Sequence, residues 1–332
     1  MTTYSVELDR ACPASLDTRQ MLIREVHRGL LGRPRSLPPW IFYDARGSRI
    51  FEDITQLPEY YPTRTERDIL ASCCDDIIAA ACTGNSDAVR LVELGAGTAS
   101  KTAILLDAAA RFHSEVLYAP VDVSSDALDV ACETISSSLP EVCLSPIVAN
   151  YVTHPPQLEC FDGMTLGLYI GSSIGNFTPE EARTILRNLR GELQSGDALL
   201  LGVDMVKDER TLVAAYDDSD GVTAEFNLNM LHRLNRELDA DFDLAKFRHR
   251  VVWNAAQSRM EMHLESTCAQ CVRIAAAQLD VYFEERERIH TENSCKFTDA
   301  TIRVLLNDGG FDVEQTWTDE RGWYSVALAR VL

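Results

Sequence analysis

LVELGAGTASKTAILLDA, residues 91–108, decides the fold class of this chain. An apolar run meets a Gly-x-Gly turn at Gly95 and Gly97, and apolar residues then recur at helical spacing. Glycine lets the backbone turn tightly and approach a ligand closely. The stretch therefore predicts a strand, a ligand-binding turn and a helix.

Strand and helix patterns alternate on both sides of this turn. We expect strands at 90–94, 116–121, 144–149, 164–170 and 197–203, and helices at 101–112, 124–137, 179–192 and 207–216. This alternation predicts an α/β fold with a parallel sheet covered on both faces, and ligands at the carboxyl ends of its strands. The segments 311–318 and 323–330 read as a strand pair that completes the same sheet, after a helix with Thr298 as N-cap.

Composition excludes several classes of protein. The 332 residues carry a net charge of −20, which argues against binding to nucleic acid. The chain contains no run of about 18 apolar residues, so we expect no membrane span. Residues 1–15 lack the build of a secretory signal, so we expect a cytoplasmic protein. Of ten cysteines only Cys268 and Cys271 form a CxxC, and we expect thiols and no metal.

The glycine turn fits phosphate poorly. The dinucleotide fingerprint requires Gly or Ala at position 100, where this chain has Ser100. Lys101 and Thr102 stand at the wrong spacing for a P-loop. A nucleotide-dependent oxidoreductase is therefore disfavoured, while an ordinary strand-to-helix turn stays an alternative.

Three polar residues point to a different nucleoside. Glu93 precedes the turn, Asp122 ends the second strand and Asn150 ends the third. A carboxylate accepts from both hydroxyls of a ribose, and an amide can read the edge of an adenine. The combination resembles the S-adenosylmethionine (SAM) site of class I methyltransferases.

A second set of polar residues marks a candidate catalytic and substrate site. Asn176 lies in a glycine-flanked loop after the fourth strand, followed by a capping box at 178–181. Glu292 and Ser294 are two apart on an expected strand and face the same way. A turn asparagine and an exposed strand face are the alternatives.

Other segments read as a second module. The stretch 37–66 is rich in aromatics, Pro and Gly, and we expect it to be irregular yet ordered, as a cap over a site. Residues 221–238 look helical, and 248–283 alternate like antiparallel strands.

The chain resembles the histidine-specific SAM-dependent methyltransferases that make the betaine precursor of ergothioneine. The resemblance covers about residues 36–298, in YDARGSRIFEDITQLPEYYPTRTE, ELGAGTASKT, GSSIGNFTP, GVDMVKD, AYDDSDGVTAEFN, NRELDADFD and TENSCKF. It implies a Rossmann-like class I methyltransferase domain and an α+β substrate-binding domain. We expect the SAM domain at 63–206 plus 296–332, and the substrate domain at 1–62 plus 207–295.

The resemblance also implies a role for each matching residue. The residues implied for SAM are Gly95, Gly97, Lys101 on its carboxylate, Asp122 on its ribose, Asn150 and Tyr151. The residues implied for the amino acid are Phe51, Tyr60, Gly171, Asn176 and Tyr216 on its carboxylate and amine end, Thr223, Met262, and Glu292 and Ser294 on its imidazole. Tyr43 and Asn176 are implied as catalytic. One departure is Ala149-Asn150, where the family has Gly-Asp; an amide oxygen still accepts from adenine.

The implied reaction is the transfer of three methyl groups from SAM to the α-amine of L-histidine, which gives hercynine. We expect a small-molecule substrate, no metal and a monomer. Two alternatives remain: the same chemistry on another amino acid such as tryptophan or a derivative, and a non-catalytic SAM-binding module.

Overall fold

The computed structural model describes residues 14–82 and 87–332. Most of the stretch 1–15, and Cys12 with it, falls outside these residues. The described chain divides into two compact units. The large unit comprises Thr55–Asp218, Val252–Glu261 and Asn293–Leu332; the small unit comprises the described residues up to Ile54, with Ser219–Val251 and Met262–Glu292. Nowhere in the described ranges is a helix both long and apolar enough to span a membrane.

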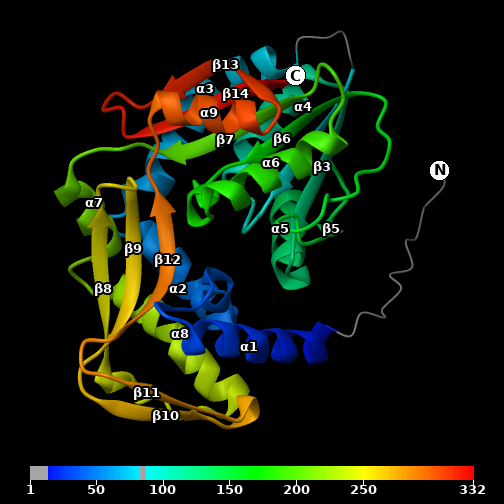
Figure 1. Ribbon diagram of the computed structural model, residues 1–332. Helices are drawn as coiled ribbons and strands as arrows, with labels where there is room; N and C mark the ends of the chain where they lie inside the picture. The colour runs from blue at the N-terminus through cyan, green and yellow to red at the C-terminus, as the bar shows by residue number, and fades with distance from the viewer. Residues whose placement is uncertain (1–13, 83–86) are drawn as a thin grey trace. The chain divides into compact units, whose positions relative to one another are not determined.

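The large unit is built on an eight-stranded sheet in the order β13-β14-β7-β6-β2-β3-β4, with β5 also paired to β3 (Figure 1). Its strands are β2 (Ala88–Leu94), β3 (Glu115–Asp122), β4 (Cys143–Leu144), β5 (Ile147–Val148), β6 (Met164–Tyr169), β7 (Ala198–Asp204), β13 (Phe311–Thr318) and β14 (Tyr324–Val331). Strands β2 to β7 pair in parallel, whereas β14 runs antiparallel to both β7 and β13. The predicted α/β fold and the closing strand pair are confirmed.

Helices cover both faces of this sheet. Apolar side chains of α3 (Tyr61–Ala81), α4 (Thr102–Phe112) and α5 (Ser125–Ser138) form one core with the sheet, and those of α6 (Pro179–Glu192) and α9 (Asp299–Asp308) form the other. Figure 1 shows α9 and α6 on one side of β7 and β6. Double coverage explains why the strands read as nearly continuous apolar runs, since neither face meets water. The remaining helix of the large unit is α7 (Glu209–Tyr216).

The small unit combines helices with strands, of which β10 and β11 pair antiparallel and β1 pairs in parallel with β12. Its elements, some of which run past its boundary, are α1 (Ala14–Leu31), β1 (Arg35–Ser36), η1 (Pro39–Phe42), α2 (Ala45–Gln56), α8 (Val222–Leu238), η3 (Leu244–Lys246), β8 (Phe247–Asn254), β9 (Arg259–Ser266), β10 (Gln270–Ile274), η4 (Ala275–Ala277), β11 (Leu279–Phe283) and β12 (Arg288–Cys295). One sheet has the order β1-β12-β9-β8, and β10 pairs with β11. The strand alternation predicted for 248–283 is confirmed.

One predicted irregular segment contains a helix. Residues 45–56 form α2, which the stretch of aromatics and prolines concealed. Asp44 accepts a hydrogen bond from the amide of Gly47 at 2.7 Å, as an N-cap does, and Ile50 and Ile54, one turn apart, are both buried. The segment is ordered, as predicted, but it is not irregular throughout.

The predicted strand at 144–149 is also wrong in part. The structure has two short strands there, β4 and β5, separated by Ser145 and Pro146. Proline has no amide proton to donate to a sheet, so a continuous strand is disfavoured at Pro146.

Candidate active site

The glycine turn, residues 95–101, joins β2 to α4 at the carboxyl edge of the large sheet. Gly95 and Gly97 have φ angles of 74° and 53°, which residues with a side chain rarely adopt. A Cβ atom at Gly95 would lie 3.0 Å from the hydroxyl of Tyr151, whereas at Gly97 it would meet no atom within 4 Å. The backbone at Gly97 is therefore open to a ligand.

A buried carboxylate supports the turn from the strand. Glu93 accepts hydrogen bonds from the hydroxyl of Thr102 at 2.7 Å and from the hydroxyl of Tyr118. Burial raises the pKa of Glu93 to about 7, although both hydroxyls act to lower it. Glu93 ties the end of β2 to the start of α4 and so holds the turn.

A second buried carboxylate, which sequence reasoning missed, organises two predicted site residues. Glu66 on α3 forms an ion pair with Lys101 and accepts hydrogen bonds from the amide of Gly171, at 2.8 and 3.0 Å, and from the hydroxyl of Tyr324 at 2.8 Å. A Cβ atom at Gly171, whose φ is 83°, would lie 3.3 Å from the ammonium of Lys101. Glu66 thus brings Lys101 and Gly171 together.

The other predicted cofactor residues follow β3 and β5. Asp122 ends β3, is partly buried and accepts from the amide of Ser124 at 2.9 Å. Burial raises its pKa, against the lowering effect of backbone amides. Asn150 is exposed, and its side-chain oxygen accepts from the amide of Val152 at 3.2 Å. Tyr151 is partly buried, with its hydroxyl at Gly95. The structure places all these residues after strands of one sheet; their contacts with SAM stay a prediction.

The loop that carries Asn176 is fixed to two neighbouring segments. Asn176 ends a single 3-10 turn, η2 (Ser173–Asn176), after β6. The hydroxyl of Ser172, a residue in the left-handed region, accepts from the amide of Asp204 at 2.9 Å. A Cβ atom at Gly175 would lie 2.8 Å from the carbonyl oxygen of Cys295, so only glycine fits. The predicted capping box with Thr178 is confirmed. The loop therefore lies against the ends of β7 and β12.

Tyr216 and Ser294 are in direct contact. Their hydroxyl oxygens are 2.7 Å apart, and both side chains are buried. The ring of Tyr60, the residue before α3, lies edge-on to the ring of Tyr216 with centroids 6.2 Å apart. Three residues predicted to bind the amino acid are therefore neighbours in the large unit.

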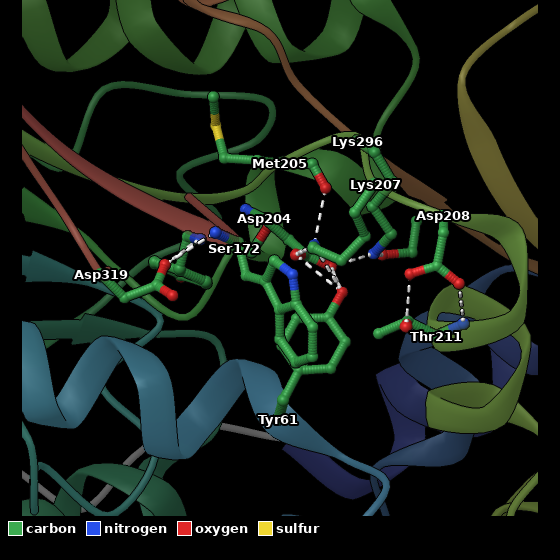
Figure 2. A network of polar contacts seen from close by, with 12 residues as sticks. Tyr61, Ser172, Asp204, Met205, Lys207, Asp208, Thr211, Lys296 and Asp319 are labelled. Carbon is green, nitrogen blue, oxygen red and sulfur yellow. Dashed lines mark hydrogen bonds and ion pairs between the residues drawn. The ribbon is translucent and has the colours of Figure 1, made fainter. Parts of the chain in front are cut away.

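A cluster of buried charges adjoins this pair. The Asp204 cluster consists of Tyr61, Asp204, Lys207, Tyr216, Ser294 and Lys296. Asp204 ends β7 and accepts from the hydroxyl of Tyr61 at 2.9 Å, from Lys207, and from Lys296 at 2.7 Å; Figure 2 shows these contacts. Lys296 also donates to Tyr216 at 2.7 Å and to Ser294 at 2.8 Å. Desolvation lowers the pKa of Lys207 to about 8.

Backbone pairing explains how the cluster assembles. The amide of Phe297 donates to the carbonyl of Asp204 at 2.9 Å, and the amide of Val206 donates to the carbonyl of Phe297 at 2.8 Å. These bonds fix the segment after β12 beside the end of β7, which brings Lys296 to Asp204. The motif TENSCKF contained a signal for Lys296, because Glu292, Ser294 and Lys296 stand at every second position and so share one face of a strand. In the structure all three are buried.

The remaining predicted residues belong to the small unit. Tyr43 follows η1 and is 43% exposed. Its ring and that of Phe51 both pack edge-on or tilted against Phe226, with centroids 5.7 and 5.9 Å apart. Aromatic packing of this kind fixes the direction of the tyrosine ring.

Thr223, Met262 and Glu292 are all buried in that unit, with exposed fractions of 3%, 3% and 7%. Thr223 lies in the first turn of α8, Met262 on β9 and Glu292 on β12. The hydroxyl of Thr291 donates to the carbonyl of Met262 at 3.0 Å, which links β12 to β9. Because Glu292 is buried, the alternative that it belongs to an exposed strand face is wrong.

Comparison with known proteins adds an independent line of evidence. A family model described as "Histidine-specific methyltransferase, SAM-dependent" matches residues 22–331. The histidine N-alpha-methyltransferase of Mycolicibacterium smegmatis is 44% identical over 310 residues, which are 93% of this chain and 95% of that protein. The enzyme of the same name from Mycobacterium tuberculosis is 42% identical over 308 residues, 93% and 94% of the two chains. The 4-dimethylallyltryptophan N-methyltransferase of Claviceps purpurea is 25% identical, over 90% of this chain and 92% of that protein.

Proposed function

Since this chain belongs to the family of histidine-specific, SAM-dependent methyltransferases, we propose that it transfers three methyl groups to the α-amine of L-histidine. The product would be hercynine, the betaine precursor of ergothioneine. The support comes from the relatives named histidine N-alpha-methyltransferase and from the polar residues brought together in the large unit.

The glycine turn and its neighbours fit SAM. When bound, SAM supplies an electrophilic methyl group on a positively charged sulfur. The open backbone at Gly97 gives room for close approach. Lys101 has three N–H groups, of which Glu66 takes one, so two can meet a carboxylate. Asp122 would accept from the ribose hydroxyls. The oxygen of Asn150 already accepts from Val152 and has a second lone pair for adenine.

Each end of histidine has candidate partners in this chain. Asn176 and Tyr216 would bind the carboxylate and amine end, while Glu292 and Ser294 would bind the imidazole. The further residues proposed to line the substrate are Tyr43, Phe51, Tyr60, Gly171, Thr223 and Met262. The observation that carries the choice of substrate is the match of residues 22–331 to the histidine-specific family model, together with the 44% and 42% identity to the two histidine N-alpha-methyltransferases.

Catalysis would rest on orientation. The attacking amine must be unprotonated and lie in line with the methyl group, and such positioning contributes roughly 7–11 kcal/mol. Tyr43, held by its aromatic neighbours, and Asn176, held by a fixed loop, are the proposed catalytic residues and act first as orienters. Binding of the substrate at its carboxylate and at its imidazole would let the α-amine nitrogen rotate between the three methyl transfers.

Mass spectrometry of the products tests the proposal directly. Purified protein is incubated with SAM and a mixture of the twenty amino acids. We expect a gain of three methyl groups on histidine alone. The Glu292→Ala variant should lose histidine affinity and selectivity; unchanged values would overturn the imidazole assignment.

A second candidate is the same reaction on tryptophan or a derivative. The likeness to the Claviceps purpurea enzyme supports it, at a lower identity than the histidine relatives. Competition between histidine and tryptophan for the same preparation separates the two. SAM binding with no methylated amino acid would instead favour a non-catalytic module.

We also propose that the protein works in the cytoplasm, as a monomer and without a metal, with SAM bound by the predicted domain at 63–206 plus 296–332. The nine cysteines of the described residues are free thiols, which suits a reducing compartment. Light scattering at assay concentration would test the monomer, and a full turnover in excess chelator would test the absence of a metal.

A further inference from the structure

The carboxylate of Glu66 is completely buried and accepts from three groups. Lys101 donates to one oxygen, the hydroxyl of Tyr324 donates to the other at 2.8 Å, and the amide of Gly171 lies 2.8 and 3.0 Å from the two. A carboxylate has two oxygens with about four lone-pair sites, so these donors fix its plane as well as its position. Because Glu66 has no exposed surface, it would act on a ligand through one of these partners.

Strand β7 makes room for this carboxylate. Gly202 lies inside β7, where a glycine weakens a strand and often marks a close approach by another group. A Cβ atom there would collide with a carboxylate oxygen of Glu66 and would lie 3.1 Å from the hydroxyl of Tyr324. The glycine therefore leaves the space that Glu66 occupies against the sheet.

The ammonium of Lys101 keeps donors for a further acceptor. Within residues 14–82 and 87–332 it donates to Glu66 alone, which leaves two of its three N–H groups. The side chain is 19% exposed, and Gly171 lacks the Cβ atom that would lie 3.3 Å from the ammonium. Two N–H groups of an ammonium held in one place suit the oxygens of a second carboxylate.

We propose that Glu66 is a positioning residue for the carboxylate of SAM and acts through Lys101. A lysine has a flexible four-carbon stem, and the pair with Glu66 holds its ammonium beside Gly171. A side chain that is ordered before the ligand arrives loses less conformational entropy on binding. This inference rests on the proposed function, which assigns Lys101 to that carboxylate, and goes beyond it by naming the residue that orders Lys101.

The charge of Glu66 alone would have the opposite effect. A carboxylate beside Lys101 weakens the attraction of the ammonium for a second carboxylate, so its removal would strengthen SAM binding. Loss of positioning would weaken SAM binding. The sign of the change in a Glu66 variant therefore decides between the two effects.

The experiment compares S-adenosylhomocysteine, which is SAM without its methyl group, with its decarboxylated analogue, in which a hydrogen atom replaces the carboxylate. Calorimetry on the unaltered protein should show a preference for S-adenosylhomocysteine. In Glu66→Gln we expect this preference to fall roughly 10–100-fold, as for a lost hydrogen bond to a charged group. A variant that is only destabilised would bind both molecules more weakly and keep the preference, so the ratio of the two affinities reports on positioning.

Tyr324→Phe is the matched control. It removes one donor from Glu66 but leaves the carboxylate, its pair with Lys101 and its bonds to the amide of Gly171. It should therefore lower stability and keep the preference. Lys101→Met removes the ammonium itself and should lose the preference. Adding Glu66→Gln to Lys101→Met should then cost little more, because the two residues act as one unit.

Glu66→Asp covers the case in which Glu66→Gln does not fold. It keeps the charge but draws it back by one methylene group, so it should lower the preference too. An unchanged or greater preference in Glu66→Gln, or in Glu66→Asp where only that variant folds, would overturn the inference. If Lys101→Met keeps the preference, Lys101 does not meet the carboxylate and the inference falls with that assignment. Methylation of histidine by the unaltered protein tests the proposed function separately.

Discussion

The glycine turn and the Asp204 cluster lie at the same edge of one sheet but are built in opposite ways. The turn depends on backbone conformation at Gly95 and Gly97, and Asp122 beside it is only partly buried. The Asp204 cluster depends on buried charged side chains that hydrogen-bond to one another. We infer that the turn is shaped for contact with a ligand at little cost in stability. The cluster, in contrast, lowers stability and fixes the orientation of its side chains.

The largest expected effect tests the cost of the cluster. Asp204→Asn leaves the ammonium groups of Lys207 and Lys296 buried without a carboxylate. Removal of one partner from a buried ion pair destabilises by roughly 3–5 kcal/mol, which urea denaturation would measure. Asp122→Asn is the control at the turn and should change the free energy of unfolding by less than about 1 kcal/mol. Equal effects of the two substitutions would remove the contrast between the regions.

A smaller effect concerns pH at the turn. Because burial raises the pKa of Glu93 from 4.5 to about 7, the folded protein holds this proton more tightly than the unfolded chain does. Glu93 thus contributes stability that is fully present below pH 4.5 and is lost as pH rises through about 7. The free energy of unfolding should fall by about 2–3 kcal/mol more in the unaltered protein than in Glu93→Gln between pH 5 and pH 8. Parallel curves for the two proteins would mean that Glu93 is ionised throughout.

The smallest effect sharpens the claim that the turn is open. Gly97→Ala adds a methyl group that meets no protein atom. Because the φ angle there is 53°, alanine should destabilise the folded backbone by about 1 kcal/mol. Gly196, at the start of β7 and at the opposite edge of the sheet, also has a positive φ and open space. Both alanine variants should lose stability by thermal denaturation, and Gly196→Ala should lose more, because its φ of 97° lies farther from the left-handed region that residues with a side chain can adopt. Only Gly97→Ala should weaken SAM binding, about tenfold, measured by calorimetry. Equal SAM affinities would mean that SAM does not approach Gly97.

The same contrast explains which parts of the molecule can be predicted from sequence. The turn, the capping box at Thr178 and the helix with Thr298 as N-cap each lie within a few consecutive residues, so spacing alone identified them. The strand pair that completes the sheet was also predicted, because its alternation is local.

The Asp204 cluster could not be predicted in this way. Its members come from α3, the end of β7 and the segment after it, α7 and the end of β12, and the pairing of Phe297 with Asp204 brings the end of β12 to the end of β7. Glu66 was missed for the same reason, since nothing near it in sequence shows that Lys101 and Gly171 are its partners. The helix α2 was missed because the prolines and aromatics before it concealed the spacing of Ile50 and Ile54.

The position of Glu66 in the chain has a practical consequence for recombining enzymes of this class. The helix that carries it, α3, comes before β2, the first parallel strand of the sheet. A chimera joined at β2 would inherit the glycine turn yet take its counter-charge for Lys101 from a foreign parent. Crossover points that precede Tyr61 should therefore give active hybrids more often than those placed between α3 and β2.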